Sequence, residues 1–128
     1  MRVLIVDDYP GLIELYEVAL GARGFEVTGA ATAGEALTRA ATERFDAVVL
    51  DVELPDGSGL ELVGRLRAIP ALAGVPLVGM SSYAPMAVRE YFDGFLPKPF
   101  HPKRLATLIR RLLRRAAAAA DRVIPSCT

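Results

Sequence analysis

The sequence has one cysteine, no excess charge of either sign and no long apolar run, and each shortage excludes a class of protein. Cys127 is the single cysteine, so no internal disulfide can form, and it does not sit fourth from the end as prenylation requires. The 15 basic and 15 acidic residues cancel, which gives no overall attraction to nucleic acid or anionic membrane. No apolar segment is long enough to span a membrane.

The start of the chain does not read as a signal peptide. Four apolar residues, Val3–Val6, are followed at once by Asp7 and Asp8. With 128 residues, of which 52% are hydrophobic and 23% charged, the composition is that of one globular domain. We predict a cytoplasmic protein with one domain over residues 1–120 and a C-terminal tail over residues 121–128.

Short apolar runs alternate with helical patterns from end to end. The runs, each bounded by polar or turn residues, predict five buried strands: Val3–Val6, Phe25–Thr28, Ala47–Leu50, Leu77–Met80 and Gly94–Leu96. Near-continuous apolar strands separated by helices are typical of a parallel sheet that is covered on both faces. The handedness of the crossovers then favours an α/β, doubly wound open sheet.

Helical spacing and capping residues mark the segments between these strands. Leu12, Leu15, Tyr16, Ala19 and Leu20 define the inner face of a first helix, which Gly24 ends. Capping-box patterns at Thr32–Glu35 and Ser58–Glu61 open two more helices. Pro102 fits the first turn of a last helix with a continuous apolar stripe: Leu105, Leu108, Ile109, Leu112 and Leu113.

Polar side chains follow four of the predicted strands. Asp7 and Asp8 follow the first strand, Asp51 the third, Ser81 the fourth and Lys98 the fifth. In doubly wound sheets the carboxyl ends of the strands form one edge, where ligands bind. Two unit charges at 4 Å repel by about 4 kcal/mol at an effective dielectric of 20, so three carboxylates require compensation. An all-oxygen ligand set of this kind suits Mg²⁺.

The same groups suit transfer of a phosphoryl group to a carboxylate. A carboxylate accepts a phosphoryl group when nearby positive charge screens it from the incoming oxygens. Mg²⁺ and the Lys98 ammonium would supply that charge, and the Ser81 hydroxyl would donate a hydrogen bond to a phosphoryl oxygen. Each residue alone also has an ordinary interpretation, as a turn acid or a surface lysine, but four strand ends contribute matching chemistry.

These residues resemble a known family. The segments Val3–Asp8, Val48–Asp51, Pro55–Gly57, Ser81 and Lys98–Phe100 are similar to the receiver domain of bacterial two-component response regulators, over residues 2 to about 115. The resemblance implies a flavodoxin-like strand order, 2-1-3-4-5.

The resemblance also implies roles for single residues. Asp51 would be the phosphoacceptor, and Ser81 and Lys98 would contact the phosphoryl group. Phe95 would be an aromatic switch residue. The Lys98–Pro99 peptide bond would be cis. Mg²⁺ would be held by Asp8 and Asp51 directly, by Asp7 through water and by the backbone carbonyl of Glu53.

The sequence departs from the family after Ser81. The segment Tyr83–Asp93 is about five residues short, or a turn and a half of helix, and Pro85 restricts its start. We therefore expect a fourth helix that is short or absent and an altered output surface. Glu53 either reaches the acceptor or points to solvent, and Tyr83 flanks the same site and would shield it from water.

Three other groups have competing interpretations. Met80, Met86, Tyr91 and Phe92 form either a partner-binding patch or a cover for the sheet. His101 is interpreted as a local capping or surface residue and not as a phosphohistidine. The last helix carries a basic face, made of Arg104, Arg110, Arg111, Arg114 and Arg115. A solvated face is the default interpretation. Docking of an acidic partner is favoured over nucleic-acid binding, because no recognition motif accompanies the arginines.

The leading hypothesis is therefore a phosphoacceptor protein, not an enzyme. A sensor histidine kinase or a histidine phosphotransfer protein would phosphorylate Asp51, and a downstream protein target would bind the phosphorylated form differently. The chain could also form a homodimer. Neither nucleic acid nor membrane is expected as a partner.

The alternative is a receiver-like interaction module that works without phosphorylation. A phosphatase of the haloacid dehalogenase type is disfavoured because the sequence lacks its Asp-x-Asp motif and cap. A flavodoxin-like cofactor binder is disfavoured because Asp7 and Asp8 stand where amide donors should meet phosphate.

Overall fold

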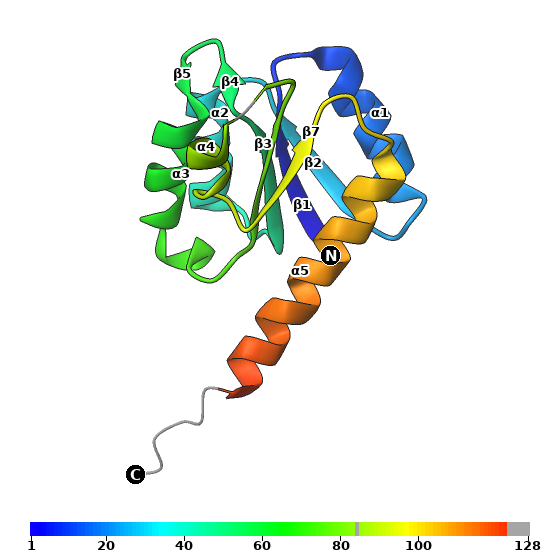
Figure 1. Ribbon diagram of the computed structural model, residues 1–128, viewed down its shortest axis with the longest axis vertical. Coiled ribbons are helices and arrows are strands. Elements are labelled where there is room, and N and C mark those ends of the chain that lie inside the picture. Colours follow the sequence, from blue (N-terminus) through cyan, green and yellow to red (C-terminus); the bar gives the residue numbers. More distant parts are fainter. Residues whose placement is uncertain (84, 123–128) are drawn as a thin grey trace.

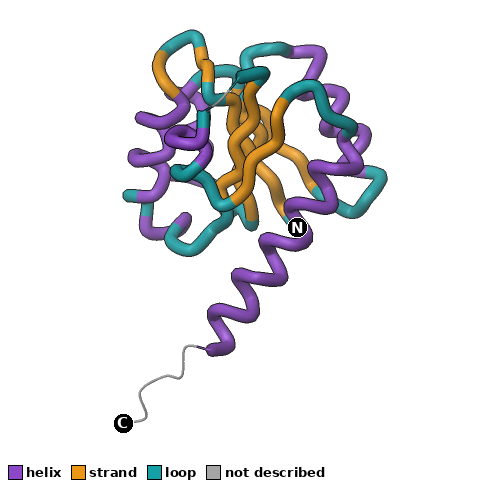
Figure 2. The backbone as a smooth tube through the Cα atoms, viewed as in Figure 1, coloured by secondary structure: helices purple, strands orange, loops and turns teal. Residues whose placement is uncertain are grey.

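The computed structural model describes residues 1–83 and 85–122. Its central sheet, which Figure 2 shows in orange between helices, consists of five parallel strands. Their order is β2-β1-β3-β6-β7. Their bounds are β1 Arg2–Val6, β2 Glu26–Ala30, β3 Ala47–Asp51, β6 Leu77–Ser81 and β7 Gly94–Pro97. The predicted doubly wound parallel sheet and its order are confirmed, because β6 and β7 are the fourth and fifth strands of this sheet.

Helices cover both faces of the sheet (Figure 1). Two helices, α1 (Pro10–Gly21) and α5 (Pro102–Arg122), pack together on one face. On the other face α2 (Ala33–Thr42) packs against α3 (Gly59–Arg67). Within the part of the chain that the structure describes, no helix is long and apolar enough to cross a membrane.

Alternating side chains of the strands divide the core into two layers. In β1, Val3 and Ile5 join the cluster under α1 and α5, whereas Leu4 and Val6 join the cluster under α2 and α3. All four side chains are 0% exposed. A strand that is buried on both faces must be apolar at every position, which is why these runs show no alternation in the sequence.

The prediction for the inner face of α1 is wrong at one residue, Leu15. Leu15 is 49% exposed, whereas Tyr16 and Leu20 are buried against the sheet. Ile13 faces inward instead: a β-carbon built on Gly29 of β2 would lie 2.5 Å from Ile13 Cγ2. The helix packs on the edge strand through this close contact, which turns Leu15 toward solvent.

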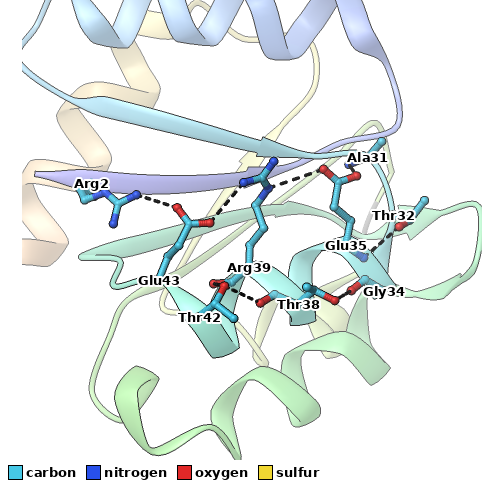
Figure 3. A network of polar contacts seen from close by, with 9 residues as sticks. All are labelled: Arg2, Ala31, Thr32, Gly34, Glu35, Thr38, Arg39, Thr42 and Glu43. Carbon is cyan, nitrogen blue, oxygen red and sulfur yellow. Dashed lines mark hydrogen bonds and ion pairs between the residues drawn. The ribbon is translucent and has the colours of Figure 1, made fainter.

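A chain of charged contacts runs along α2 (Figure 3). Thr32 Oγ1 accepts a hydrogen bond from Glu35 N at 3.1 Å, as predicted, but the Glu35 carboxylate accepts from Ala31 N and not from Thr32 N. Arg39 contacts both Glu35 and Glu43. Hydrogen bonds from Arg2, at 2.8 Å, and from Arg39 lower the pKa of the Glu43 carboxyl.

The segment after β6 is short, as predicted. Helix α4 spans only Met86–Arg89. The apolar side chains around it divide into two groups, and the predicted covering of the sheet holds for one of them, while partner binding stays a prediction for the other. Met80 (0% exposed) and Phe92 (9% exposed) cover the sheet, whereas Met86 (70%) and Tyr91 (57%) face solvent.

Two small elements were not predicted. A hairpin, β4 (Glu53–Leu54) and β5 (Gly57–Ser58), surrounds the expected turn, and a 3-10 helix, η1 (Pro70–Leu72), follows α3. The structure does not describe the side chain of Ser58, so the predicted capping role of Ser58 stays a prediction. Helix α5 includes the first two residues of the predicted tail, and residues 123–128 with Cys127 lie outside the described residues.

Candidate functional site

The carboxyl end of β1 buries a carboxylate. Asp7 is 1% exposed, whereas Asp8 is exposed. The backbone fixes Asp7 on both sides: its N–H donates to Ala30 O at 3.0 Å, and its carboxylate Oδ1 accepts from Tyr9 N at 3.0 Å. A buried charge needs such partners, because an isolated carboxylate is costly to remove from water.

Asp51 and Lys98 meet Asp7 at the same edge of the sheet. Lys98 Nζ lies 2.8 Å from Asp51 Oδ2 and 3.1 Å from Asp7 Oδ2. Asp51 is 9% exposed, and its other oxygen, Oδ1, accepts from Glu53 N at 2.8 Å. One ammonium group therefore bridges two carboxylates that would otherwise repel each other. The sequence prediction that these three strand ends converge is correct.

Lys98 keeps its proton in this setting. Burial is the largest single influence on its pKa and lowers it, but the hydrogen bonds and negative charges of Asp51 and Asp7 together outweigh burial. The net result is a pKa above the usual value for lysine. The group at the centre of the site is thus a fixed positive charge at neutral pH.

The acidic groups fit a divalent cation. One carboxylate oxygen each from Asp7, Asp8 and Asp51 lie within 4.8 Å of one another. Oxygen donors at this spacing match the preference of Mg²⁺, which binds through a few carboxylates and keeps several waters. Asp8 is exposed, so the cation would be reached from solvent. Whether the backbone carbonyl of Glu53 joins the ligands stays a prediction.

Ser81 ends β6 at the same edge, and its hydroxyl bonds within its own loop. Ser81 is 2% exposed. Its Oγ donates to Tyr83 O at 2.8 Å and accepts from Tyr83 N at 3.1 Å. The Tyr83 side chain is 80% exposed, and its predicted shielding of the site stays a prediction. The hydroxyl must therefore give up a bond to the loop before it can donate to a ligand in the site.

Phe95 lies between two neighbours on the α2–α3 side of the sheet. Its ring is 5.9 Å from that of Phe92, and the Arg89 guanidinium carbon lies 5.1 Å from the Phe95 centroid. Both rings lie over Gly79, where an added β-carbon would come within 2.8 Å of each. Its switch role stays a prediction. The Lys98–Pro99 peptide bond that follows is cis, as predicted.

The hairpin beside Asp51 is tied to α2 by a residue that the sequence did not reveal. Asp56 Oδ1 accepts from Ala33 N at 2.8 Å, and Asp56 Oδ2 accepts from Gly34 N at 3.1 Å. These are free amides of the first turn of α2, so Asp56 caps a helix more than twenty residues away. The hydrogen bonds from Ala33 and then Gly34 lower the pKa of Asp56. A Pro-Asp-Gly turn gives no signal for such a long-range cap.

This cap predicts a pH-dependent stability. The pKa of Asp56 is lower in the folded protein than in the unfolded chain. Its carboxylate therefore stabilises the fold fully above about pH 3.9, and this stabilisation is lost as the pH falls through the folded pKa. The variant Asp56→Asn should melt at a lower temperature than the wild type at pH 7, and the difference should shrink at pH 3. Thermal melts followed by circular dichroism measure both.

Glu53→Gln is the matched control for Asp56→Asn. It removes one negative charge from the same hairpin, and the Glu53 side chain is exposed. The control should melt like the wild type at both pH values. Equal melting of Asp56→Asn and the wild type at pH 7 would show that the cap does not stabilise the fold.

Tyr16 places a buried phenol near the charged groups. Its ring stacks on Phe100 with 6.1 Å between centroids, and its hydroxyl donates to Met80 Sδ at 3.9 Å. Burial, the main cause, raises the pKa of Tyr16; the Lys98 charge opposes this, and the charges of Asp7 and Asp51 add to it. The apolar periodicity of α1 marked Tyr16 as a core residue but did not show that its hydroxyl lies near the site.

Sequence comparisons agree with this geometry. The family model for the response regulator receiver domain matches residues 3–110. An uncharacterized 14.6 kDa protein of Leptolyngbya boryana is 34% identical, with 87% of this chain and 88% of that protein covered. The DNA-binding response regulator MtrA of Mycolicibacterium smegmatis is also 34% identical, over 89% of this chain. The chain spans about half the length of MtrA (51%).

Solved structures agree as well. A CheY-like receiver domain protein of Methanospirillum hungatei has a TM-score of 0.85 and 29% identity, and the match covers 92% of this chain and 97% of that one. A CheY-like receiver domain of Methylobacillus flagellatus has a TM-score of 0.80 and 32% identity, with 88% and 98% covered. The chain therefore belongs to the response regulator receiver domain family of two-component signalling.

Proposed function

We propose that Asp51 accepts a phosphoryl group from a histidine kinase or a histidine phosphotransfer protein, and that the phosphorylated domain signals through altered protein binding. The observation that carries this proposal is the setting of the Asp51 carboxylate. One oxygen is held by the Glu53 amide and the other by the Lys98 ammonium, at 2.8 Å each. A carboxylate fixed in this way beside positive charge is oriented for attack.

The transfer step follows from these contacts. A carboxylate oxygen of Asp51 attacks phosphorus, the bond from phosphorus to the donor nitrogen or oxygen breaks, and the donor leaves with that electron pair. The product is an acyl phosphate. Lys98, which bridges Asp51 and Asp7, would move its hydrogen bond to a phosphoryl oxygen and offset the added negative charge. Mg²⁺ bound by Asp8 and Asp51, with Asp7 nearby, would supply further charge compensation.

Ser81 would link this chemistry to the surface. Its hydroxyl holds both the N–H and the carbonyl of Tyr83 in the unphosphorylated protein. A hydrogen bond from Ser81 to the phosphoryl group would replace the one to the Tyr83 carbonyl and release that part of the loop. The exposed Tyr83 side chain would then move relative to the short helix α4. A target that binds the two states differently would read this change.

Intact mass spectrometry after incubation with Mg²⁺ and acetyl phosphate tests the acceptor. The wild type should gain one phosphoryl group, and EDTA should abolish the gain. Asp51→Asn should show none, whereas Asp46→Asn, at the opposite end of β3, should be phosphorylated like the wild type. Absence of the gain in the folded wild type, or its survival in Asp51→Asn, would contradict the proposal. The first outcome would favour an interaction module that works without phosphorylation.

A further inference from the structure

Helix α5 extends well past the sheet that it covers. Its N-terminal part packs on the core through Leu105 and Ile109, both 0% exposed, and Leu112 is the last buried side chain described along it. The rest of the helix, residues 113–122, projects beyond the body of the molecule (Figure 1). It leaves the sheet at its edge opposite Asp51, beside Met1 and the loop before β2.

A groove lies between this part of α5 and the N-terminal edge of the sheet. Its volume is about 440 Å³, and four apolar residues line it and are called its floor: Met1, Phe25, Leu113 and Ala117. Gly24 and three arginines, Arg23, Arg110 and Arg114, complete the lining. A lining that combines apolar and cationic groups suits a ligand that has both an apolar group and negative charge.

Two of these arginines are held in place. The Arg110 guanidinium carbon lies 5.1 Å from the Phe25 ring centroid, and Arg110 also donates a hydrogen bond to Arg23 O. The Arg23 side chain donates to Ala19 O at 2.9 Å. Because these side chains are already ordered, a ligand that contacts them loses less conformational entropy on binding.

The cations of α5 form no ion pair among the described side chains. Residues 1–60 contain 11 acidic and 4 basic side chains, and residues 61–128 contain 4 acidic and 11 basic ones. None of the six cations from Lys103 to Arg115 has a described carboxylate within 4.0 Å, although four other cations of the chain do: Arg2, Arg39, Arg67 and Lys98.

We propose that this groove, lined by Met1, Phe25, Leu113, Ala117 and the three arginines, binds an acidic segment of a partner protein that carries one large apolar side chain. The apolar side chain occupies the floor, and carboxylates on either side of it meet Arg114 and Arg23. Charge complementarity of this kind gives orientation and fast association.

Two other occupants are outcomes of the test below. A nucleic acid matches the arginines but leaves the apolar floor empty. A second copy of this chain could present exposed carboxylates such as Glu14 and Glu17, and it would be detected as a dimer. Since the groove lies at the edge away from Asp51, the proposal does not depend on phosphorylation.

Fluorescence anisotropy with a designed probe tests this proposal on the unphosphorylated chain. The probe is a short fluorescein-labelled peptide of glutamates with one central phenylalanine. It should bind more tightly than the same peptide with alanine in place of phenylalanine, and more tightly than a peptide in which lysines replace the glutamates. The variant Ala117→Glu should weaken binding about tenfold or more, because it places bulk and a like charge in the groove.

Ala118→Glu is the matched control, since Ala118 is the next residue of α5, is exposed and does not line the groove. It should bind the probe within about twofold of the wild type, and Arg114→Glu should weaken binding as Ala117→Glu does. Equal effects of Ala117→Glu and Ala118→Glu, or no binding by the wild type, would overturn the proposal. So would tighter binding of labelled duplex DNA, or a dimer that ultracentrifugation detects and Ala117→Glu removes.

Discussion

Gly59→Ala is expected to lower the free energy of unfolding by about 3 kcal/mol, the upper end of the usual cost of overpacking. A β-carbon at this position would lie 2.7 Å from Val52 Cα and 2.8 Å from the carbonyl oxygens of Asp51 and Val52. These are backbone atoms of the segment that carries the candidate acceptor, and Gly59 N also donates to Val52 O at 2.7 Å. Urea unfolding measures the loss.

Gly64→Ala, on the same helix, is expected to change the stability in the opposite direction. Apart from its chain neighbours and the backbone of its own helix, no atom lies within 4 Å of a β-carbon built on Gly64, which is exposed in the middle of α3. Alanine there should stabilise the protein by about 0.5–1 kcal/mol, because glycine is a poor helix former. If both substitutions change stability in the same direction, close packing of α3 against the acceptor loop is not the reason that Gly59 is needed.

Lys98→Met is expected to cost about 3 kcal/mol of stability in the absence of divalent cations. Methionine keeps the length of the side chain but removes the ammonium that lies 3.1 Å from Asp7 and 2.8 Å from Asp51. Removing one partner of a buried ion pair costs about 3–5 kcal/mol, and the lower end applies here because the Lys98 side chain is 22% exposed. Urea unfolding in EDTA measures the effect.

The other lysine of the chain is the control. Lys103 is exposed in the first turn of α5, and Lys103→Met should change stability by no more than about 0.5 kcal/mol. Mg²⁺ should stabilise Lys98→Met more than the wild type, since the cation then supplies the missing positive charge. A Lys98→Met protein as stable as the wild type in EDTA would mean that the two carboxylates do not need the ammonium.

The sheet and the position of the site could be predicted because buried parallel strands have a simple signature. The runs Val3–Val6 and Ala47–Leu50 are apolar at every position, and the acids that follow them fall at one edge of the sheet by topology alone. Family resemblance supplied the remaining roles. The short α4 was predicted from the family resemblance, because the segment Tyr83–Asp93 is about five residues shorter than the family leads one to expect and Pro85 restricts its start.

Contacts between distant segments could not be predicted from local patterns. Leu15 satisfied the helical periodicity but faces solvent, because the close approach of Ile13 to Gly29 sets the rotation of α1. The Asp56 cap joins two loops whose distance only the folded chain defines. The hairpin has strands of two residues each, which is too short for alternation to be recognised. The hydroxyl of Ser81 was predicted to face a phosphoryl group, and its bonds to Tyr83 depend on loop geometry.

The buried position of Tyr16 has a spectroscopic consequence. The chain contains no tryptophan and four tyrosines, so its intrinsic emission on excitation near 280 nm comes from the tyrosine phenols. The side chains of Tyr9, Tyr83 and Tyr91 are exposed, so their emission depends mainly on solvent. Tyr16 is 4% exposed, and the charges of Lys98, Asp7 and Asp51 act on its phenol. The one phenol that differs from the rest is thus a natural optical probe, already in place, of the charge balance at the edge of the sheet.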